Sequence, residues 1–261
     1  MSTYVISDMH GRLELFLKML EKIDFSENDR LYCLGDAADR GPKGIELFLL
    51  LMQMNNVTYI TGNHDLLFTK AVRKAVQMGY SEAVLDTDEF RLWMINGGAT
   101  TWNRYITLER DVRRQILAYI GSSYLLIPQL KVGERYFYLC HATHAERPVK
   151  EPLLLKDADR KDINHVIWER VYPRGQRLFM PRKNYYYSEL YNAYPRKTTL
   201  IFGHTPTAIF SKTDSNGRGR IWHGGSGHLI DIDCGCAVRE DRYAMLGCLR
   251  LEDMKEFYVH Y

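Results

Sequence analysis

The apolar residues in the first part of the chain alternate between two periods. Short apolar runs at residues 4–6, 31–34 and 57–61 are typical of buried strands. Between and after them, apolar residues recur every three to four positions, which predicts helices, and Pro42 suits the first turn of the second helix. Strands that alternate with helices in this way predict an α/β fold with parallel strands.

The pattern beyond this region is less regular but still predicts elements. Residues 145–197 hold most of the prolines and many aromatic residues, which indicates an excursion of the chain over the functional face. No internal repeat, low-complexity tract or linker divides the chain, so we expect a single domain over residues 1–261. The further elements that we expect are helices over 88–96 and 108–120 and strands over 125–132, 136–140, 198–202, 229–232, 243–251 and 256–259.

Composition restricts the class of protein. The 261 residues are 46% hydrophobic and 26% charged, which is typical of a globular protein with a sizeable core. The net charge of +3 is too small to indicate a nucleic-acid partner, and we expect none beyond a nucleotide substrate. The longest apolar run, residues 47–52, is far shorter than a membrane span.

The chain ends and the cysteines indicate a compartment. The first residues lack the basic and apolar segments of a signal peptide. An odd number of cysteines, five, without a disulfide framework points to a reducing environment, so we expect a cytoplasmic protein without a membrane partner. Cys234 and Cys236 form at most half of a zinc site, and buried thiols are the simpler interpretation.

Polar residues follow five of the predicted strands. Each strand ends in Asp, His or Asn, and four of these residues lie beside glycine. One such segment alone is usually an ordinary surface or core residue, but five in succession are hard to obtain by chance. Ligands bind at the carboxyl ends of strands in open α/β sheets, so we expect these side chains to meet at one edge. They are Asp8, His10, Asp36, Asn63, His141 and His204.

This set of side chains suits metal ions. Carboxylate, imidazole and amide oxygen together favour manganese, iron or zinc, whereas an all-oxygen set would favour magnesium or calcium. The ligands outnumber what one ion needs, so two ions that share a carboxylate are the economical interpretation. Two metals about 3.5–4 Å apart bind a phosphoryl group and activate water. We expect two divalent ions, with manganese first, and iron or zinc as alternatives.

The same segments resemble a known family. Residues 8–11, 35–41 and 62–65 are similar to the three N-terminal motifs of the calcineurin-like metallophosphoesterases, and more narrowly of the phosphoprotein phosphatase branch. The resemblance extends over about residues 3–236, and Asn96-Gly97-Gly98 is similar to small bacterial and phage phosphatases of that branch. It implies a single metallophosphoesterase domain, a two-sheet β-sandwich flanked by helices (αββα).

The resemblance also implies a role for each candidate ligand. Asp8 and His10 are expected to bind the first metal, and Asp36 is expected to bridge both ions. The second metal is expected to be completed by Asn63, His141 and His204.

Further residues are implied to act on the substrate. His64 is the expected general acid, oriented and kept protonated by Asp39, since an alkoxide leaving group needs a proton. Arg40 and Arg170 are expected to hold the phosphate oxygens, because a planar guanidinium matches phosphate geometry. Only the Ile-Trp-x-Arg context favours Arg170 over Arg147, Arg174 and Arg177, any of which could take its place.

The substrate is the least constrained feature. Asp39-Arg40-Gly41 is typical of serine/threonine protein phosphatases, some of which also accept phosphotyrosine. Symmetrical dinucleoside-tetraphosphate hydrolases resemble this chain in length and in two motifs but typically lack the aspartate before the arginine. We therefore expect a phosphorylated protein or a small phosphoester as substrate, with nucleotide or RNA-end phosphatases as alternatives. An inactive scaffold that binds phosphorylated partners is disfavoured by the complete ligand set. Nothing in the chain indicates an oligomeric state.

Overall fold

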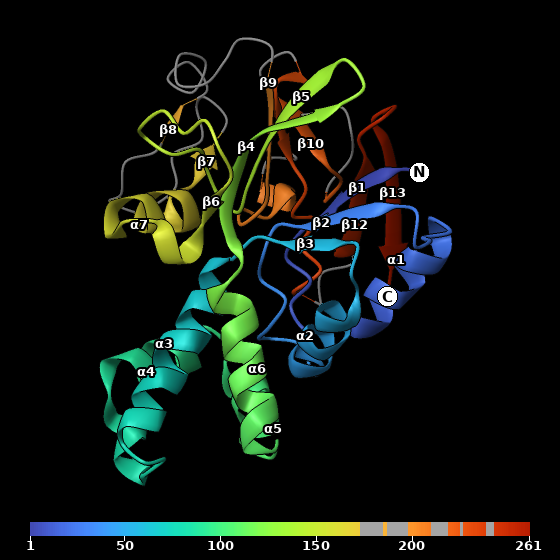
Figure 1. Cartoon of the computed structure of the whole chain (residues 1–261). Coiled ribbons are helices and arrows are strands. Elements are labelled where there is room, and N and C mark those ends of the chain that lie inside the picture. Colours follow the sequence, from blue (N-terminus) through green and yellow to red (C-terminus); the bar gives the residue numbers. More distant parts are fainter. Residues whose placement is uncertain (173–184, 187–197, 210–218, 225–226, 239–242) are drawn as a thin grey trace.

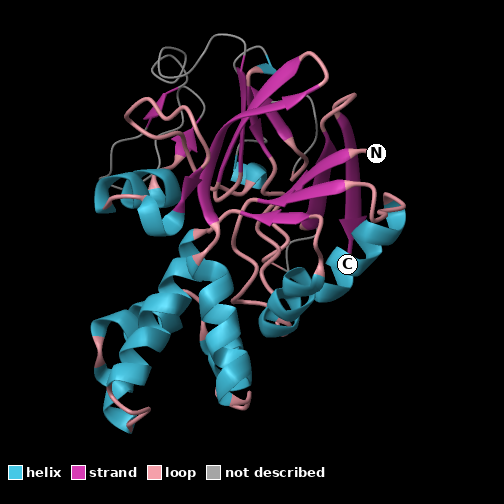
Figure 2. Cartoon of the chain, in the orientation of Figure 1, coloured by secondary structure: helices cyan, strands magenta, loops and turns pink. Residues whose placement is uncertain are grey.

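Two β-sheets that pack against each other form the centre of the molecule, and helices lie outside them (Figures 1 and 2). This computed structural model describes residues 1–172, 185–186, 198–209, 219–224, 227–238 and 243–261. The expected two-sheet α/β architecture is confirmed. The sequence pattern had supported parallel strands, whereas the second sheet had followed only from the family resemblance.

The first sheet has the strand order β13-β12-β1-β2-β3. Its three N-terminal strands are parallel, and Ile6 pairs with Cys33, which in turn pairs with Tyr59. These strands therefore end at the same level, and the residues that follow them start side by side. The bounds are β1 (Thr3–Ile6), β2 (Arg30–Cys33), β3 (Val57–Tyr59), β12 (Met245–Arg250) and β13 (Lys255–His260).

The second sheet has the order β10-β11-β9-β5-β4-β6. Here too the strands that carry predicted ligands, β5 and β9, are parallel, and β9 also pairs in parallel with β11. The bounds are β4 (Tyr124–Val132), β5 (Arg135–Cys140), β6 (Leu153–Leu154), β9 (Thr198–Phe202), β10 (Trp222–Gly224) and β11 (Leu229–Asp231). A separate short pair consists of β7 (Val171–Tyr172) and β8 (Tyr185–Tyr186).

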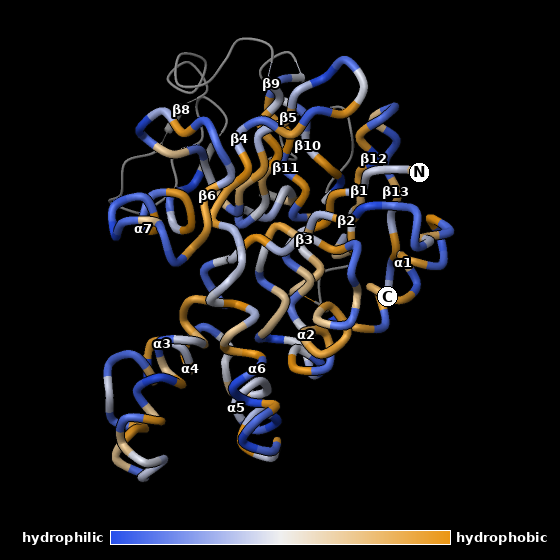
Figure 3. The backbone as a smooth tube through the Cα atoms, in the orientation of Figure 1, coloured by the Kyte–Doolittle hydropathy of each residue, from blue (hydrophilic) through white to orange (hydrophobic). Residues whose placement is uncertain are grey.

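The strand β1 is buried on both faces, which explains its continuous apolar run. Val5 joins the cluster between the sheets, where it meets Phe137 and Ile201 of the second sheet. Tyr4 and Ile6 belong instead to the cluster beneath the helices. Figure 3 shows hydrophobic stretches along the strands where the two sheets meet.

The helices form three groups around the sheets (Figure 1). Helices α1 (Leu13–Lys22) and α2 (Gly44–Gln53) lie against the first sheet, and α7 (Arg160–Trp168) lies beside the second. The remaining helices project from the sheets and are called the arm below. They are α3 (Asn63–Gln77), α4 (Asp88–Ile95), α5 (Ala99–Tyr105) and α6 (Arg110–Gly121). The described part of the chain also contains the 3₁₀ helices η1 (Glu82–Asp86), η2 (Leu155–Asp157) and η3 (Thr207–Ile209).

Aromatic contacts hold the arm together. Phe68 of α3 lies with its ring centre 5.4 Å from Trp93 of α4 and 5.1 Å from Tyr105 of α5. Such pairs are worth about 0.5–1.5 kcal/mol each beyond the area they bury. The arm is therefore a packed unit rather than a set of loose helices.

Several described elements had no counterpart in the sequence pattern, among them α5, α7, β6, β7, β8 and β10. The excursion expected over residues 145–197 lies partly outside the described residues, and its described portion contains η2 and α7. All five cysteines are buried free thiols. No helix among the described residues has the length and apolar character needed to cross a membrane.

Candidate active site

The loops after the strands of both sheets meet and bond to one another. The N–H of Asp8 donates to the Gly35 carbonyl at 3.1 Å, and the N–H of His10 donates to the Asp36 carbonyl at 2.8 Å. Across the sheets, the N–H of His204 donates to Asp8 Oδ2 at 3.0 Å. The expected convergence of strand ends is thus a set of direct hydrogen bonds.

The backbone at this meeting point is strained. Left-handed φ angles between 43° and 69° occur at several non-glycine residues of the predicted set. Such angles are uncommon outside glycine and persist only where the surrounding structure enforces them, often at functional sites. The residues concerned are Asp8, His10, Asp36, Asp39, Arg40 and His204.

Two glycines allow the backbone to approach the carboxylates. A Cβ atom at Gly62 would lie 2.1 Å from Asp36 Oδ1, and one at Gly203 would lie 2.2 Å from Asp8 Oδ2. Neither glycine has a left-handed φ, so close approach rather than turn geometry requires them.

Side chains that could hold metal ions form two groups that share one carboxylate. Among the described residues, the donor atoms of His10, Asp36 and His64 lie within 4.8 Å of one another, and so do those of Asp36, His141 and His204. The first group contains His64, which was predicted as the acid, whereas the predicted ligand Asp8 lies beside it, with Oδ1 4.0 Å from His10 Nε2. Asp36 Oδ2 lies 3.7 Å from His10 Nε2 and 3.5 Å from His141 Nε2. The shared position of Asp36 fits a residue that bridges two ions.

Two of the histidines present their Nε2 atoms to the centre. His10 Nδ1 and His141 Nδ1 bond to the carbonyls of Ala38 and Leu34, at 3.0 and 2.7 Å. These bonds assign the proton to Nδ1 and leave Nε2 as the atom that a metal cation would bind in place of its present polar neighbours.

Asn63 and His204 complete the second group. Asn63 Oδ1 lies 2.8 Å from His204 Nδ1 and 3.0 Å from His141 Nε2. Within the described part of the chain, the buried Nε2 atom of His204 has no hydrogen-bond partner. A buried donor or acceptor left unpaired is costly, so this atom fits a metal ligand. The residues present therefore suit two divalent cations.

The buried carboxylates at the centre also favour bound cations. Burial raises the pKa of Asp8 to about 6 and also raises the pKa of Asp36. Although burial opposes it, the charges of Asp36 and Asp8 raise the pKa of His141. Buried carboxylates that resist ionisation are the groups that a bound cation would stabilise.

The predicted acid and its partner are in contact. His64 Nδ1 donates to Asp39 Oδ2 at 2.9 Å. The Trp93 indole N–H donates to both oxygens of Asp39, at 3.0 and 2.9 Å, and the Asp39 N–H donates to Thr101 Oγ1 at 2.9 Å. Trp93 and Thr101 belong to α4 and α5, so the arm positions the acid pair. Neither of these two residues was predicted from the sequence as part of the site.

Burial acts against protonation of the histidine of this pair. It lowers the pKa of His64 to about 4, and the Arg40 guanidinium acts in the same direction against the opposing charge of Asp36. Burial raises the pKa of Asp39 to about 7. The implied role of Asp39 in keeping His64 protonated stays a prediction.

The predicted arginines lie at the site. Arg40 donates to His10 Nε2 at 3.1 Å and to His64 Nε2 at 3.0 Å. Arg170 donates to the His204 carbonyl at 2.8 Å. Arg147 instead pairs with Asp162 of α7 at 2.6 Å. The remaining candidates for the second phosphate-binding arginine, Arg174 and Arg177, lie outside the described residues.

Two buried aspartates at the end of β11 were missed. Asp231 and Asp233 are 0% and 4% exposed, and the Asp233 N–H donates to Asp231 Oδ1 at 3.0 Å. Burial and the charge of Asp8 raise the pKa of Asp233 to about 7. The signal was available, because residues 229–232 were predicted as a strand and a glycine, Gly235, follows, as at the other strand ends.

Comparison with known proteins supports a shared ancestry. The chain is 26% identical over 290 residues to a symmetrical bis(5'-nucleosyl)-tetraphosphatase of Nitrosomonas europaea, covering 99% of this chain and 98% of that protein. It is 25% identical over 169 residues to serine/threonine-protein phosphatase 1 of Salmonella typhimurium, covering 64% and 68%. A solved serine/threonine phosphatase from Saccharomyces cerevisiae shares the fold, with a TM-score of 0.64 at 14% identity, over 100% of this chain and 80% of that one. Residues 1–232 match the family described as calcineurin-like phosphoesterase, and the chain belongs to that family.

Proposed function

We propose that this phosphoesterase is a dinuclear-metal phosphomonoesterase that acts on phosphoserine and phosphothreonine in proteins. The observation that carries the proposal is the 2.9 Å contact between His64 and Asp39, which joins the acid pair to the group of His10 and Asp36. When bound, two divalent ions, of which we propose manganese, supply the charge that draws in a phosphoryl group and lowers the pKa of water. Asp8, His10, Asp36, Asn63, His141 and His204 would hold them.

The arginines would orient the phosphate. Arg40 presents both terminal nitrogens toward the centre, where each now bonds to a histidine. Arg170 follows α7 and lies next to His204. Two planar guanidinium groups match the oxygens of a phosphate monoester.

His64 would give its proton from Nε2, since Asp39 engages Nδ1. Trp93 fixes Asp39 and thereby the plane of the imidazole ring. A phosphate dianion that draws Arg40 to itself would weaken the influence that lowers the pKa of His64 and add negative charge nearby. We therefore infer that the acid gains its proton together with the substrate.

A second candidate is symmetrical hydrolysis of dinucleoside tetraphosphates. The similarity to the Nitrosomonas protein over nearly the full length of both chains favours it. Its leaving group, however, is a phosphate with a pKa near 6, which needs a proton far less than a serine alkoxide does. A dedicated buried acid pair therefore favours the monoester substrate.

The extent of the domain also matters for the site. We infer that residues 1–261 form one domain, because β12 pairs with β1 and β13 pairs with β12. The last strands, which lie beyond the matched residues 1–232, belong to the sheet that carries Asp8 and Asp36.

The test compares substrates on manganese-loaded protein. We expect hydrolysis of p-nitrophenyl phosphate that depends on manganese, and a higher kcat/KM for a phosphoserine peptide than for diadenosine tetraphosphate. A strong preference for the dinucleotide would replace the first proposal by the second. A folded, metal-loaded sample that hydrolyses none of the three would favour a scaffold that only binds phosphorylated partners.

A further inference from the structure

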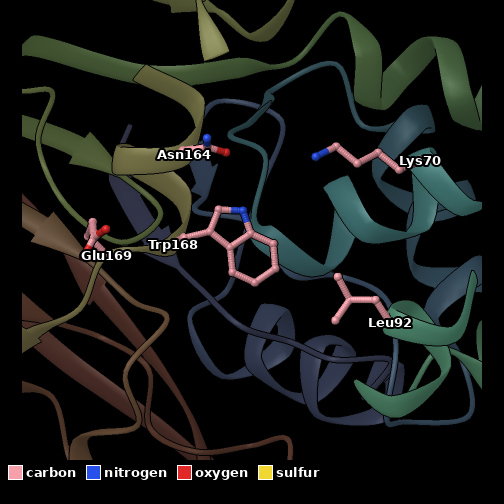
Figure 4. A pocket seen from close by; sticks show the side chains of 5 residues that line it. All are labelled: Lys70, Leu92, Asn164, Trp168 and Glu169. Carbon is pink, nitrogen blue, oxygen red and sulfur yellow. The ribbon is translucent and has the colours of Figure 1, made fainter. Parts of the chain in front are cut away.

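A pocket of 460 Å³ lies between the arm and α7 (Figure 4). Figure 4 shows Lys70 of α3, Leu92 of α4 and Asn164 of α7 directed toward the indole of Trp168, while Glu169 lies on the far side of that ring. Its volume falls in the range of roughly 300–1,000 Å³ that is usual for ligand sites. None of these residues belongs to the metal or acid groups described above.

Each helix that lines the pocket also carries, or closely precedes, a residue of the catalytic centre. Lys70 lies seven residues after Asn63 on α3, hence on the same face of the helix and about 10 Å further along its axis. Leu92 directly precedes Trp93, which holds Asp39, and Glu169 directly precedes Arg170. The acid His64 lies in the first turn of the same helix α3, so the pocket lies beside elements that carry residues of the catalytic centre.

The chemistry of the lining favours a peptide over a ligand whose charges are all of one sign. Among the described residues, the lining combines one cation, one carboxylate and one amide with an indole and an aliphatic side chain. The Asn164 amide has the donor and the acceptor that match a peptide bond. Leu92 is 50% exposed in the wall, so it offers apolar surface that a second apolar side chain would cover.

We propose that this pocket binds an apolar side chain of the phosphoprotein about three residues from the phosphoserine. The spacing follows from the offset of about 10 Å and the rise of about 3.3 Å per residue in an extended chain. The apolar side chain would lie between Leu92 and Trp168, and the neighbouring peptide bond would pair with Asn164. This inference rests on the proposed protein phosphatase function.

The test uses Leu92→Ser with Ile95→Ser as matched control. Ile95 lies one turn further along α4, is 84% exposed and does not line the pocket. Two phosphoserine peptides are compared, one with leucine three positions away on both sides and one with alanine at those positions. Manganese-dependent turnover of p-nitrophenyl phosphate normalises every variant, since that substrate is too small to reach the pocket.

We expect Leu92→Ser to lower kcat/KM for the leucine peptide about tenfold more than it lowers kcat/KM for p-nitrophenyl phosphate. Ile95→Ser should affect the two substrates equally. For the alanine peptide Leu92→Ser should show no excess loss, because the contact is already absent. Equal kcat/KM for both peptides on the unmodified protein would overturn the proposal. An excess loss confined to diadenosine tetraphosphate would do so too and would indicate a nucleoside site. Failure of the unmodified protein to hydrolyse either peptide would instead remove the proposed function, and this inference with it.

Discussion

The catalytic centre and the pocket beside it are built on opposite principles. At the centre, the side chains are buried, and left-handed backbone and close glycines set their positions. In the pocket, side chains from three helices surround the space, and Leu92 remains half-exposed. Chemistry that needs fixed geometry thus lies on constrained strand ends, whereas the proposed recognition of the substrate lies on helix surfaces that tolerate change.

The two regions are nevertheless joined through adjacent residues. On α4, Trp93 turns inward to Asp39 while its neighbour Leu92 lines the pocket. After α7, Arg170 reaches the second ligand group while its neighbour Glu169 lines the pocket. A substrate that fills the pocket would therefore contact the elements that hold the acid pair and the phosphate. Loss of the metals should affect every substrate, loss of the acid should depend on the leaving group, and changes in the pocket should depend on the peptide.

The largest effect is expected from Asp36→Asn. Loss of the shared carboxylate should weaken both ions and lower turnover of p-nitrophenyl phosphate by roughly a thousandfold, since metal charge contributes several kcal/mol to the transition state. Elemental analysis of the purified protein measures the metal content. Asp86→Asn, a surface change at an exposed ion pair with Arg91, is the control and should retain both metals. Full metal content in Asp36→Asn would remove its bridging role.

A selective effect at the centre is expected from His64→Asn. The general acid matters in proportion to the basicity of the leaving group, so an alkyl phosphate should lose roughly 10²–10⁴-fold in kcat. The loss for p-nitrophenyl phosphate should be much smaller, because p-nitrophenolate leaves readily without a proton. The slope of log kcat against leaving-group pKa measures this difference. Equal losses on both substrates would assign His64 another role, such as metal binding with His10 and Asp36.

A smaller effect is expected from Gly62→Ala. The added Cβ meets Asp36 Oδ1 at 2.1 Å, so the carboxylate must move, and metal affinity should fall roughly 10–100-fold, as for other changes that misorient a ligand. Gly121→Ala, at the open end of α6, should leave metal affinity unchanged and stability within about 1 kcal/mol. Isothermal titration with manganese compares the two. Unchanged affinity in Gly62→Ala would mean that the backbone yields instead.

The sequence predicted the centre better than its surroundings for a physical reason. A parallel strand that ends in Asp or His beside glycine is a local signal, and parallel register brings such ends together without knowledge of the loops. The same kind of signal marks Asp231 and Asp233 at the end of β11, although these two residues were not among the predicted site residues.

The surroundings depend on packing that no local pattern contains. The bond from Trp93 to Asp39 joins residues 54 positions apart, through an aromatic cluster formed by separate helices. The pocket depends on how α7 lies against the arm, and α7 itself was not predicted. The burial that lowers the pKa of His64 likewise becomes apparent only when the whole site is assembled.

The smallest effect, and the one that most directly tests the link between arm and centre, is expected from Trp93→Phe. The ring remains in the aromatic cluster while both bonds to Asp39 are lost. Bonds to a charged group are worth about 1.5–3 kcal/mol, so the melting temperature should fall, and the freed carboxylate should orient His64 less well. We expect kcat to fall roughly tenfold for alkyl phosphates and less for p-nitrophenyl phosphate, in the same sense as His64→Asn.

The control variant is Trp102→Phe, which removes the same atoms from another indole of the same cluster. The ring centre of Trp102 lies 6.2 Å from that of Trp93, and the contact between the two residues is one between rings. If both variants lose stability and activity alike on all substrates, the arm contributes only to folding, and the acid pair is positioned without it.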